Sequence, residues 1–198
     1  MNQTDESYAQ TACIYPVILA VPKEVRSLKG RNKVMGLSRH ARRALDISAV
    51  KSHVRPGSPL KDANGVPIPF EGNYWSLTHK PTFVGGVVAP IPIGIDLEEI
   101  KAVSAAMFRK IASEREWSLC SSNSCVDFFR YWTAKEAVLK AAGIGMKGLS
   151  ACRIERIADE THVTVDYKGR LFSIEHFQFH GHIAAVVDNG CRVEWTLD

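Results

Sequence analysis

The sequence predicts an α+β fold, and three features support that class. Runs of β-branched, aromatic and aliphatic residues open the chain, fill its middle and dominate its tail, which is typical of strands. Longer segments between them repeat apolar residues every three or four positions, as helices do. The chain has 198 residues, 45% of them hydrophobic, which is enough for one large domain or two small ones with a real core.

The first half of the chain is expected to contain three strands and one helix. β-branched and apolar residues define the strands, and Ala41, Ala44 and Leu45 supply an apolar stripe for the helix. A stretch rich in Pro and Gly is expected to be a loop. The expected order is a strand at 12–21 that ends at Pro22, a helix capped by Ser38 that reaches about Ile47, a loop at 56–69, and a strand pair at 74–79 and 83–89.

The second half is expected to pass from one strand through two short helices and one long helix into a strand-rich tail. Ser113 and Glu116 have capping-box spacing at the start of the second short helix. Asp127 is expected to cap the long helix, which covers 128–142 and stops at Gly143. Strands are expected at 91–97, 153–157, 162–167, 171–177, 183–187 and 192–196, with hairpin turns at Lys168-Gly169 and Asn189-Gly190.

A partial repeat links the two halves. In each half, the pattern aromatic-Ser-aliphatic-x-His precedes two small residues and Val-Val; these strings lie at 75–79 with 85–88, and at 172–176 with 184–187. Chance similarity between two hairpins explains the letters as well as duplication of an α+β unit does. Duplication would divide the chain into similar halves at 1–92 and 93–198, with a ligand cleft between them.

Two acidic residues stand out at the end of an apolar run. Asp96 and Glu98 are two positions apart, and on a strand that spacing points both carboxylates to one face. Neighbouring carboxylates repel each other unless a cation or a proton intervenes. Oxygen ligands of this kind suit Mg²⁺, which often shares its shell with substrate phosphates. Taken alone, an exposed acidic edge strand explains the pair more simply.

The predicted long helix adds a polar stripe. Trp132, Glu136 and Lys140 are four residues apart and therefore lie along one face. An ordinary surface Glu–Lys pair would explain two of them. Alternatively, Glu136 is a metal ligand or a base, and Lys140 contacts a phosphate. Lys135 points to a different part of the helix surface and could hold a second phosphate oxygen.

Other candidate phosphate contacts come from earlier in the chain. Ser76, Thr78 and His79 close one predicted strand, while Arg39 and Arg43 share a face of the first helix. A hydrogen-bonded histidine at a strand end and a solvated helix face explain these residues without a ligand. A phosphate-binding role is the alternative, because the forked guanidinium of arginine suits a terminal phosphate.

Bulk properties restrict the class of partner. The net charge of +4 permits an acidic partner, but no long Lys/Arg run or aromatic–basic alternation argues for nucleic acid. No run reaches the roughly 20 apolar residues that span a bilayer, and the polar, acidic start is not a secretory signal. Five cysteines without CxxC or zinc spacing indicate reduced thiols. We therefore expect a cytoplasmic protein that binds neither membrane nor nucleic acid.

Together, these motifs resemble the phosphopantetheinyl transferases, of the type that activates peptide and polyketide synthases. The family's Gly-hydrophobic-Asp-x-Glu strand appears at 94–98, and its Trp-x-x-Lys-Glu-(Ala/Ser)-x-x-Lys helix at 132–140. The family's upstream Ser-x-Ser-His segment reads Ser76-Leu77-Thr78-His79, with threonine as a departure. An Arg-rich helix near the start of family members is similar to 38–45.

The resemblance implies transfer of 4′-phosphopantetheine from coenzyme A to a serine of an acyl or peptidyl carrier protein, with release of adenosine 3′,5′-bisphosphate. It assigns Asp96, Glu98 and Glu136 to Mg²⁺, for which Mn²⁺ could substitute. It makes Glu136 and Lys140 catalytic, with Glu136 as the base, directly or through a water. The residues it assigns to the phosphates of coenzyme A are Arg39, Arg43, Ser76, Thr78, His79, Lys135 and Lys140. It also implies a monomer of two similar halves.

The same resemblance shows one departure from the family pattern and implies one surface for contact with the carrier protein. Some family members carry a lysine before the proline that precedes the Ser-x-Ser-His strand; here Val66 precedes Pro67, so that contact is lost or moved, with Lys61 as the candidate. The connector at 101–126 is where the family usually meets its carrier protein. Its cations Arg109, Lys110 and Arg115 fit an acidic partner or a solvated face equally well.

Two alternatives remain on the sequence alone. The same carboxylates would serve a Mg²⁺-dependent hydrolase of coenzyme A or of a nucleotide pyrophosphate, although no hydrolase-type cluster of extra acids is present. The other alternative is a non-catalytic module that binds coenzyme A or a carrier protein. Such a module is expected to have lost one of Asp96, Glu98, Glu136 or Lys140, and all four are present.

Overall fold

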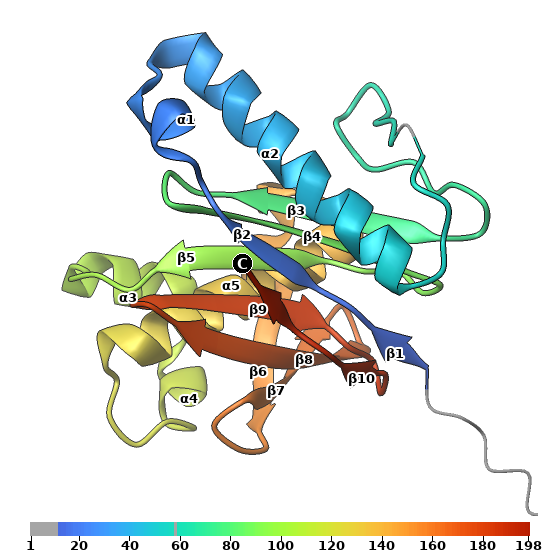
Figure 1. The fold of residues 1–198 in the computed structure, drawn as a ribbon. Coiled ribbons are helices and arrows are strands. Elements are labelled where there is room, and N and C mark those ends of the chain that lie inside the picture. The colour runs from blue at the N-terminus through green and yellow to red at the C-terminus, as the bar shows by residue number, and fades with distance from the viewer. Residues whose placement is uncertain (1–11, 58) are drawn as a thin grey trace, which may run out of the picture.

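The computed structural model describes residues 12–57 and 59–198 and confirms a mixed α+β fold. Two sheets each carry one long helix (Figure 1). Helix α2 (Gly30–Lys51) packs on the first sheet, and α5 (Cys125–Ala141) packs on the second, where the largest hydrophobic core lies. Within the described part of the chain, no helix is long and apolar enough to cross a membrane.

The first sheet joins strands from both ends of the chain. Its members are β2 (Val17–Ala20), β3 (Tyr74–His79), β4 (Phe83–Ala89) and β11 (Thr196–Leu197). Their order is β11, β2, β4, β3, and only the pair of β11 with β2 is parallel. A separate parallel pair is formed by β1 (Cys13–Ile14) and β10 (Arg192–Val193).

The second sheet is antiparallel throughout. Its members are β5 (Ile95–Glu99), β6 (Cys152–Ile157), β7 (His162–Tyr167), β8 (Arg170–Phe179) and β9 (His182–Val187). Their order is β5, β9, β8, β7, β6, so β5 is an edge strand, and it lies against β3 and β4 of the first sheet. The short helices are α1 (Lys23–Ser27), α3 (Ala105–Ile111), α4 (Glu114–Trp117) and a 3₁₀ helix (Met146–Ala151).

Several predicted elements are confirmed at their predicted bounds. The strands at 74–79, 83–89 and 162–167 are β3, β4 and β7. Ser113 and Glu116 form the expected capping box at the start of α4. Lys168 and Gly169 both have positive φ, 54° and 83°, and join β7 to β8 in a tight hairpin.

Both long helices begin earlier than predicted. α2 starts at Gly30, so Ser38 lies inside the helix and does not cap it. In α5 the cap is Ser124, whose Oγ accepts a hydrogen bond from the Asp127 N–H at 3.2 Å. The Asp127 carboxylate accepts one from the Ser124 N–H at 2.8 Å. Asp127 is therefore the second member of a capping box rather than the cap itself.

Three predicted strands are shorter than expected, and prolines explain two of them. The run at 12–21 breaks into β1 and β2 at Tyr15-Pro16, and the run at 91–97 becomes regular only at Ile95, after Pro90 and Pro92. Proline has no N–H for a ladder, so it ends or interrupts pairing. The run at 192–196 also divides, into β10 and β11, which pair with β1 and β2.

The predicted second hairpin is wrong. Asn189 and Gly190 do form a turn with positive φ, 43° and 86°. However, the strand that follows, β10, pairs with β1 and not with the preceding β9. The turn therefore sends the C-terminal strands back to the first sheet, where β11 continues beside β2.

The repeated letter strings occupy hairpins of different register. Trp75 lies opposite Val88 in the β3–β4 pair. The matching letters of the second half are Phe172 and Val187, but Val187 lies opposite Ile174 in the β8–β9 pair. The two pairings are offset by two residues, so the sequence repeat is not accompanied by the same register of strand pairing.

Two glycines allow the long helices to approach the sheets closely. A Cβ at Gly86 in β4 would lie 2.6 Å from the backbone nitrogen of Leu45 in α2. A Cβ at Gly94, just before β5, would lie 1.9 Å from the carbonyl oxygen of Ala137 in α5. Real Cβ contacts are never that short, so only glycine permits this spacing. Gly94 thereby brings the backbone of β5 against α5.

Candidate functional site

The acidic strand and the polar helical stripe meet where β5 packs on α5. Lys140 Nζ donates hydrogen bonds to Asp96 Oδ1 and to the Ile95 carbonyl, both at 2.8 Å. Trp132 Nε1 donates to Glu98 Oε1 at 3.0 Å. Glu136 lies between Trp132 and Lys140 on the same stripe. We call this group of Asp96, Glu98, Glu136 and Lys140 the acidic junction.

Ser76 and Thr78 reach the acidic junction from β3. Thr78 Oγ1 donates to Asp96 Oδ1 at 3.1 Å, and the Ile95 N–H donates to Ser76 Oγ at 3.2 Å. Both residues are buried. In this structure their hydroxyls therefore make protein contacts that join the first sheet to β5.

Two carboxylate oxygens at the acidic junction lack a hydrogen-bond partner. Asp96 Oδ2 and Glu136 Oε1 are buried and unpaired among the residues that the structure describes. A buried polar atom without a partner is costly, and each case calls for an explanation. Two such oxygens are suitable ligands for a hard divalent cation.

The donor set fits a cation that relies only partly on protein ligands. Across 12–57 and 59–198, no group of three or more His, Cys, Asp or Glu side chains is arranged as a metal site. Mg²⁺ does not need one, because it usually takes one or two carboxylates and completes its shell with water and substrate phosphates. Asp96 and Glu136 offer that number of free oxygens.

Glu136 shows the electrostatic consequence of this arrangement. Its pKa lies above the usual carboxyl range, first because burial disfavours the charged form and then because Asp96 carries like charge. Lys140 and Lys80 partly oppose the shift. A carboxyl group of this kind is suited to accept a proton and gains from a nearby cation.

Glu98 already has two protein partners. Its Oε1 accepts a hydrogen bond from Lys80 Nζ at 2.6 Å, in addition to the one from Trp132. Lys80 was not among the predicted site residues. The signal that could have found it is its position, because it directly follows His79 at the end of the strand that lies against β5.

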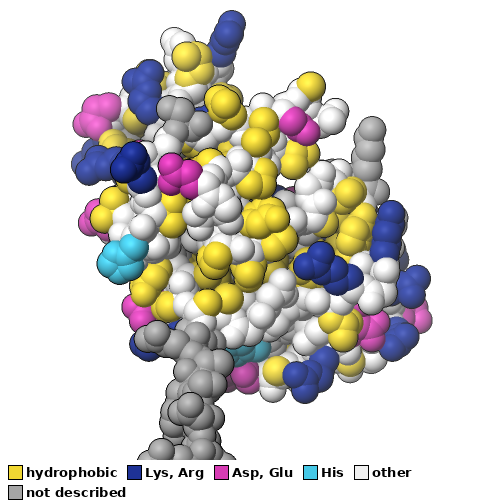
Figure 2. Space-filling model, turned by 90° about the vertical axis from the view of Figure 1, so that its right-hand side faces the viewer, with side chains coloured by type: hydrophobic (Ala, Val, Ile, Leu, Met, Phe, Trp, Pro, Cys, Tyr) yellow, Lys and Arg dark blue, Asp and Glu magenta, His cyan; other side chains and the backbone are white. Residues whose placement is uncertain are grey.

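A pocket of about 300 Å³ opens beside Lys140. Its walls come from the loop at 61–67, from β3, and from 139–145 at the end of α5. The loop lies on the right-hand side of Figure 1, and Figure 2 shows that side of the molecule, where many apolar side chains are exposed. The loop residues Leu60 and Ile68 contribute to the exposed apolar surface. The pocket thus combines apolar walls with the Lys140 ammonium.

Basic groups cluster around this pocket. Lys61 lines it together with Lys140, and the pKa of Lys61 is lowered by burial and by the charges of Arg42 and Lys140. The pKa of His79 is also lowered, first by desolvation and then by Lys140. Neighbouring cations that repel each other are relieved by an anion, so this cluster favours a phosphate-bearing ligand.

Arg42 is the arginine of α2 that reaches this region. Its Nη1 donates to the Pro59 carbonyl at 2.9 Å, and its charge acts on Lys61. The predicted Arg39 and Arg43 are both exposed. Arg42 could have been found from its position three residues before the buried Leu45, at the border of the apolar stripe.

Lys135 lies in a different environment from the one predicted. Its side chain is only 2% exposed, and its Nζ donates to Glu116 Oε1 at 2.6 Å and to the Ile111 carbonyl at 2.7 Å. Adjacent helical residues differ in direction by about 100°, so Lys135 points away from the side of α5 that carries Glu136. Lys135 therefore joins α5 to α3 and α4 and makes no contact with the acidic junction, and its predicted contact with a phosphate of coenzyme A stays a prediction.

Comparison with known proteins points to one family. Residues 92–187 match the family model of the 4′-phosphopantetheinyl transferase superfamily. Through these residues, which make up just under half of the chain, the protein is similar to the 4′-phosphopantetheinyl transferase superfamily. The matched segment contains all four residues of the acidic junction, whereas Lys61, Thr78 and His79 precede it and are placed at the site by the fold alone.

Curated phosphopantetheinyl transferases and a related synthase resemble the chain over part of their length. A 4′-phosphopantetheinyl transferase of Bacillus pumilus is 33% identical over 97 residues, which cover 46% of this chain and 42% of the relative. An L-aminoadipate-semialdehyde dehydrogenase-phosphopantetheinyl transferase of Schizosaccharomyces pombe is 42% identical over 66 residues, covering 30% and 26%. A holo-[acyl-carrier-protein] synthase of Herpetosiphon aurantiacus is 36% identical over 70 residues, covering 31% and 54%. The chain thus spans about half or less of the length of these relatives.

Proposed function

We propose that the protein transfers 4′-phosphopantetheine from coenzyme A to a serine of an acyl or peptidyl carrier protein. The observation that carries this proposal is the acidic junction: unpaired oxygens of Asp96 and Glu136 lie beside Lys140, which also lines a basic pocket. The names of the relatives, phosphopantetheinyl transferase and holo-[acyl-carrier-protein] synthase, support the same reaction.

The pocket beside Lys140 suits the nucleotide end of coenzyme A. That end carries a diphosphate and a further phosphate on the ribose, next to a flat aromatic base. Lys140 and Lys61 would contact phosphate oxygens as point charges, Arg42 would extend the cationic surface, and the His79 imidazole would offer an N–H donor. The apolar walls of the pocket would cover part of the organic moiety.

Asp96 and Glu136 would hold Mg²⁺, with Glu98 as the third predicted ligand. When bound, the ion would neutralise charge on the diphosphate and make the nucleotide a better leaving group. Mn²⁺ accepts the same oxygen ligands. The raised pKa of Glu136 supports this assignment, because a cation would remove the repulsion from Asp96 that contributes to it.

Glu136 would take the proton of the acceptor serine. The serine oxygen forms a bond to the phosphorus that carries pantetheine, and the bond from that phosphorus to the bridging oxygen breaks. The hydroxyl proton passes to Glu136, directly or through a water. Lys140 offsets the charge that develops on the departing adenosine 3′,5′-bisphosphate. The Glu136 side chain and the leaving phosphate thus account for the proton and the electron pair.

The two sheet–helix units are, in this proposal, related halves with the ligand between them, and the enzyme acts as a cytoplasmic monomer. The contact of β5 with β3 and β4 supports this, because residues from both units meet at Asp96. The five cysteines are all free thiols, which suits a reducing compartment.

An intact-mass assay tests the reaction. Apo acyl carrier protein and an apo peptidyl carrier domain are each incubated with the protein, coenzyme A and Mg²⁺. We expect a mass gain of one phosphopantetheine, which Asp96→Ala and Glu136→Ala abolish, while Glu99→Ala, a change at an exposed acid of the same strand, retains it. Coenzyme A consumed without a mass gain would instead indicate a hydrolase. No change in either substrate would contradict catalysis on these carriers.

A further inference from the structure

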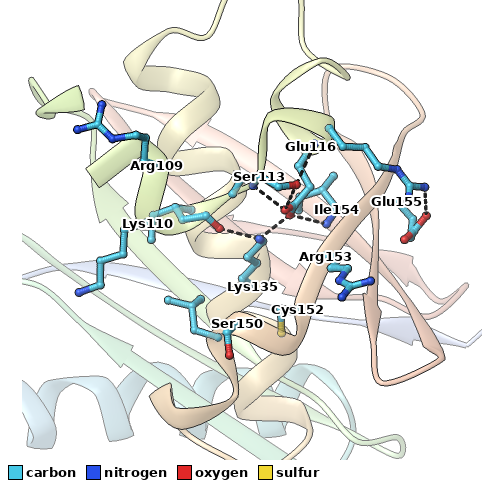
Figure 3. A pocket seen from close by; sticks show the side chains of 14 residues that line it. Arg109, Lys110, Ser113, Glu116, Lys135, Ser150, Cys152, Arg153, Ile154 and Glu155 are labelled. Carbon is cyan, nitrogen blue, oxygen red and sulfur yellow. Dashed lines mark hydrogen bonds and ion pairs between the residues drawn. The ribbon is translucent and has the colours of Figure 1, made fainter. Parts of the chain in front are cut away.

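A second basic pocket lies on another side of α5 (Figure 3). Its volume of about 420 Å³ is within the range of small-molecule sites. α3 and the start of α4 form one wall, the end of the 3₁₀ helix and β6 form the other, and Lys135 lies between them. No residue of the acidic junction lines this pocket. It is therefore separate from the proposed coenzyme A site.

The floor of the second pocket is the buried ion pair of Glu116 with Lys135, in which the carboxylate is fully hydrogen-bonded. Glu116 Oε1 accepts from Lys135 Nζ and from the Ile154 N–H, and Oε2 accepts from the N–H and the hydroxyl of Ser113. Burial raises the pKa of Glu116, but these donors outweigh it and hold the pKa below the usual range. These contacts occupy the Glu116 carboxylate at the floor of the pocket, so it does not neutralise the cations at the rim.

The Lys135 ammonium retains donor capacity. It has three hydrogens, and its acceptors within the described residues are Glu116 Oε1 and the Ile111 carbonyl. The third hydrogen has no acceptor in that part of the chain. A buried ammonium with an unused hydrogen favours an acceptor oxygen in the pocket.

The rim carries an excess of positive charge. Arg115 is paired with Glu155 at 3.5 Å. Arg109, Lys110 and Arg153 have no acidic partner within ion-pair distance among the residues described. Among the lining residues that the structure describes, five are cations and two are carboxylates, which leaves three positive charges in excess. Figure 3 shows Arg109 and Lys110 on one side of Lys135 and Arg153 on the other.

We propose that this pocket binds a multivalent oxyanion, of the kind carried by a small phosphorylated molecule. Guanidinium groups match phosphate oxygens in pairs, and an ammonium supplies a further point charge. Because the free cations stand on two sides of Lys135, a chain of linked phosphates offers oxygens to both sides at once. The concave shape and the buried floor favour a small ligand over a flat protein surface.

Calorimetric titration with inorganic tripolyphosphate, without Mg²⁺, tests the proposal. The coenzyme A pocket is silenced first by Lys61→Ala and Lys140→Ala, so that only the second pocket is read. In that background we expect binding, and Arg153→Ala should weaken it about tenfold, the value of one charge-assisted contact. Arg156→Ala is the matched control, because Arg156 is exposed on the same strand and does not line the pocket.

Two results would overturn the proposal. One is no binding in the silenced background; the other is an equal effect of Arg153→Ala and Arg156→Ala, which would show only general attraction to a basic protein. Amide NMR locates the anion independently: Ile154, whose N–H contacts Glu116, should shift on titration, and Gly143 should not. Because no transfer is measured, failure of this proposal and failure of the proposed function are distinguishable.

Discussion

Glu136 is a carboxyl group whose pKa is higher in the folded chain than in the unfolded one. Between the two values the folded state binds more protons, so stability falls as pH rises through that window and stays reduced above it. We therefore expect Glu136→Gln to raise the melting temperature at pH 7 in chelator. The gain should shrink as the pH approaches about 4, where the unfolded group also becomes protonated. Scanning calorimetry measures both; a lower melting temperature for the variant at pH 7 would contradict the assignment.

Added Mg²⁺ should act through the same residue. A ligand that binds only the folded state raises the melting temperature, and the unpaired oxygens of Asp96 and Glu136 are the expected contacts. We expect Mg²⁺ to stabilise the wild type and Glu99→Gln, but not Glu136→Gln. Equal stabilisation of all three proteins would place the ion elsewhere.

Substitutions of Lys135 and of Lys140 should have different effects, the first mainly on stability and the second mainly on activity. Replacing Lys135 by Met leaves the buried Glu116 carboxylate without its cation, and breaking a buried pair costs about 3–5 kcal/mol. Lys140→Met should abolish transfer with a smaller loss of stability, because the Lys140 side chain is 29% exposed and water can reach the pair, although its partner Asp96 is only 5% exposed. Urea denaturation and the intact-mass assay measure the two effects. Equal losses of stability would reject this division of roles.

At the scale of elements, the contact of β5 with α5 depends on Gly94. A Cβ there would collide with the Ala137 carbonyl, so Gly94→Ala must push the strand and the helix apart. We expect a loss of at least about 1–3 kcal/mol from overpacking, together with reduced transfer. Gly57→Ala is the control, since its Cβ would make only ordinary contact with Phe70 at 3.5 Å. Denaturation curves that are alike for both variants would contradict the close approach.

The caps of the long helices make a second test at this scale. Ser124 caps α5, whereas Ser38 lies within α2. Ser124→Ala should cost about 1 kcal/mol. Ser38→Ala should be neutral or slightly stabilising, because alanine is the better helix former. If Ser38→Ala proved the more damaging change in urea denaturation, the early start of α2 would be wrong.

At the scale of the whole molecule, the two halves share strands. β10 and β11 leave the second half and pair with β1 and β2 of the first. A fragment of residues 1–92 therefore lacks one strand of its sheet and the neighbouring β5. We expect this fragment to remain unfolded by circular dichroism, while the full chain unfolds in one transition seen alike by circular dichroism and fluorescence. A folded fragment would show that the halves are independent domains.

The sequence pattern predicts those structural features that depend on local periodicity. Alternating strands at 74–79 and 83–89, the Ser113–Glu116 capping box, and the stripe of Trp132, Glu136 and Lys140 all follow from the repeat of strand or helix. The same kind of periodicity places Asp96 and Glu98 on one face of their strand. Boundaries were less predictable, because Ser38 and Asp127 have cap-like chemistry but lie inside their helices.

By itself, then, the sequence determined the α+β class and most strands and helices, since these follow from spacing along the chain, while the resemblance of its motifs to a known family indicated the residues of the acidic junction. Only the tertiary structure decided which lysine faces which carboxylate. From the sequence alone, Lys135 and Lys140 are equally good candidates for a phosphate contact. The packing of α3 and α4, however, buries Lys135 against Glu116. The return of β11 to β2 and the approach of Arg42 to Lys61 are likewise contacts between distant segments. No local propensity encodes them, because they exist only once the sheets and helices have packed together.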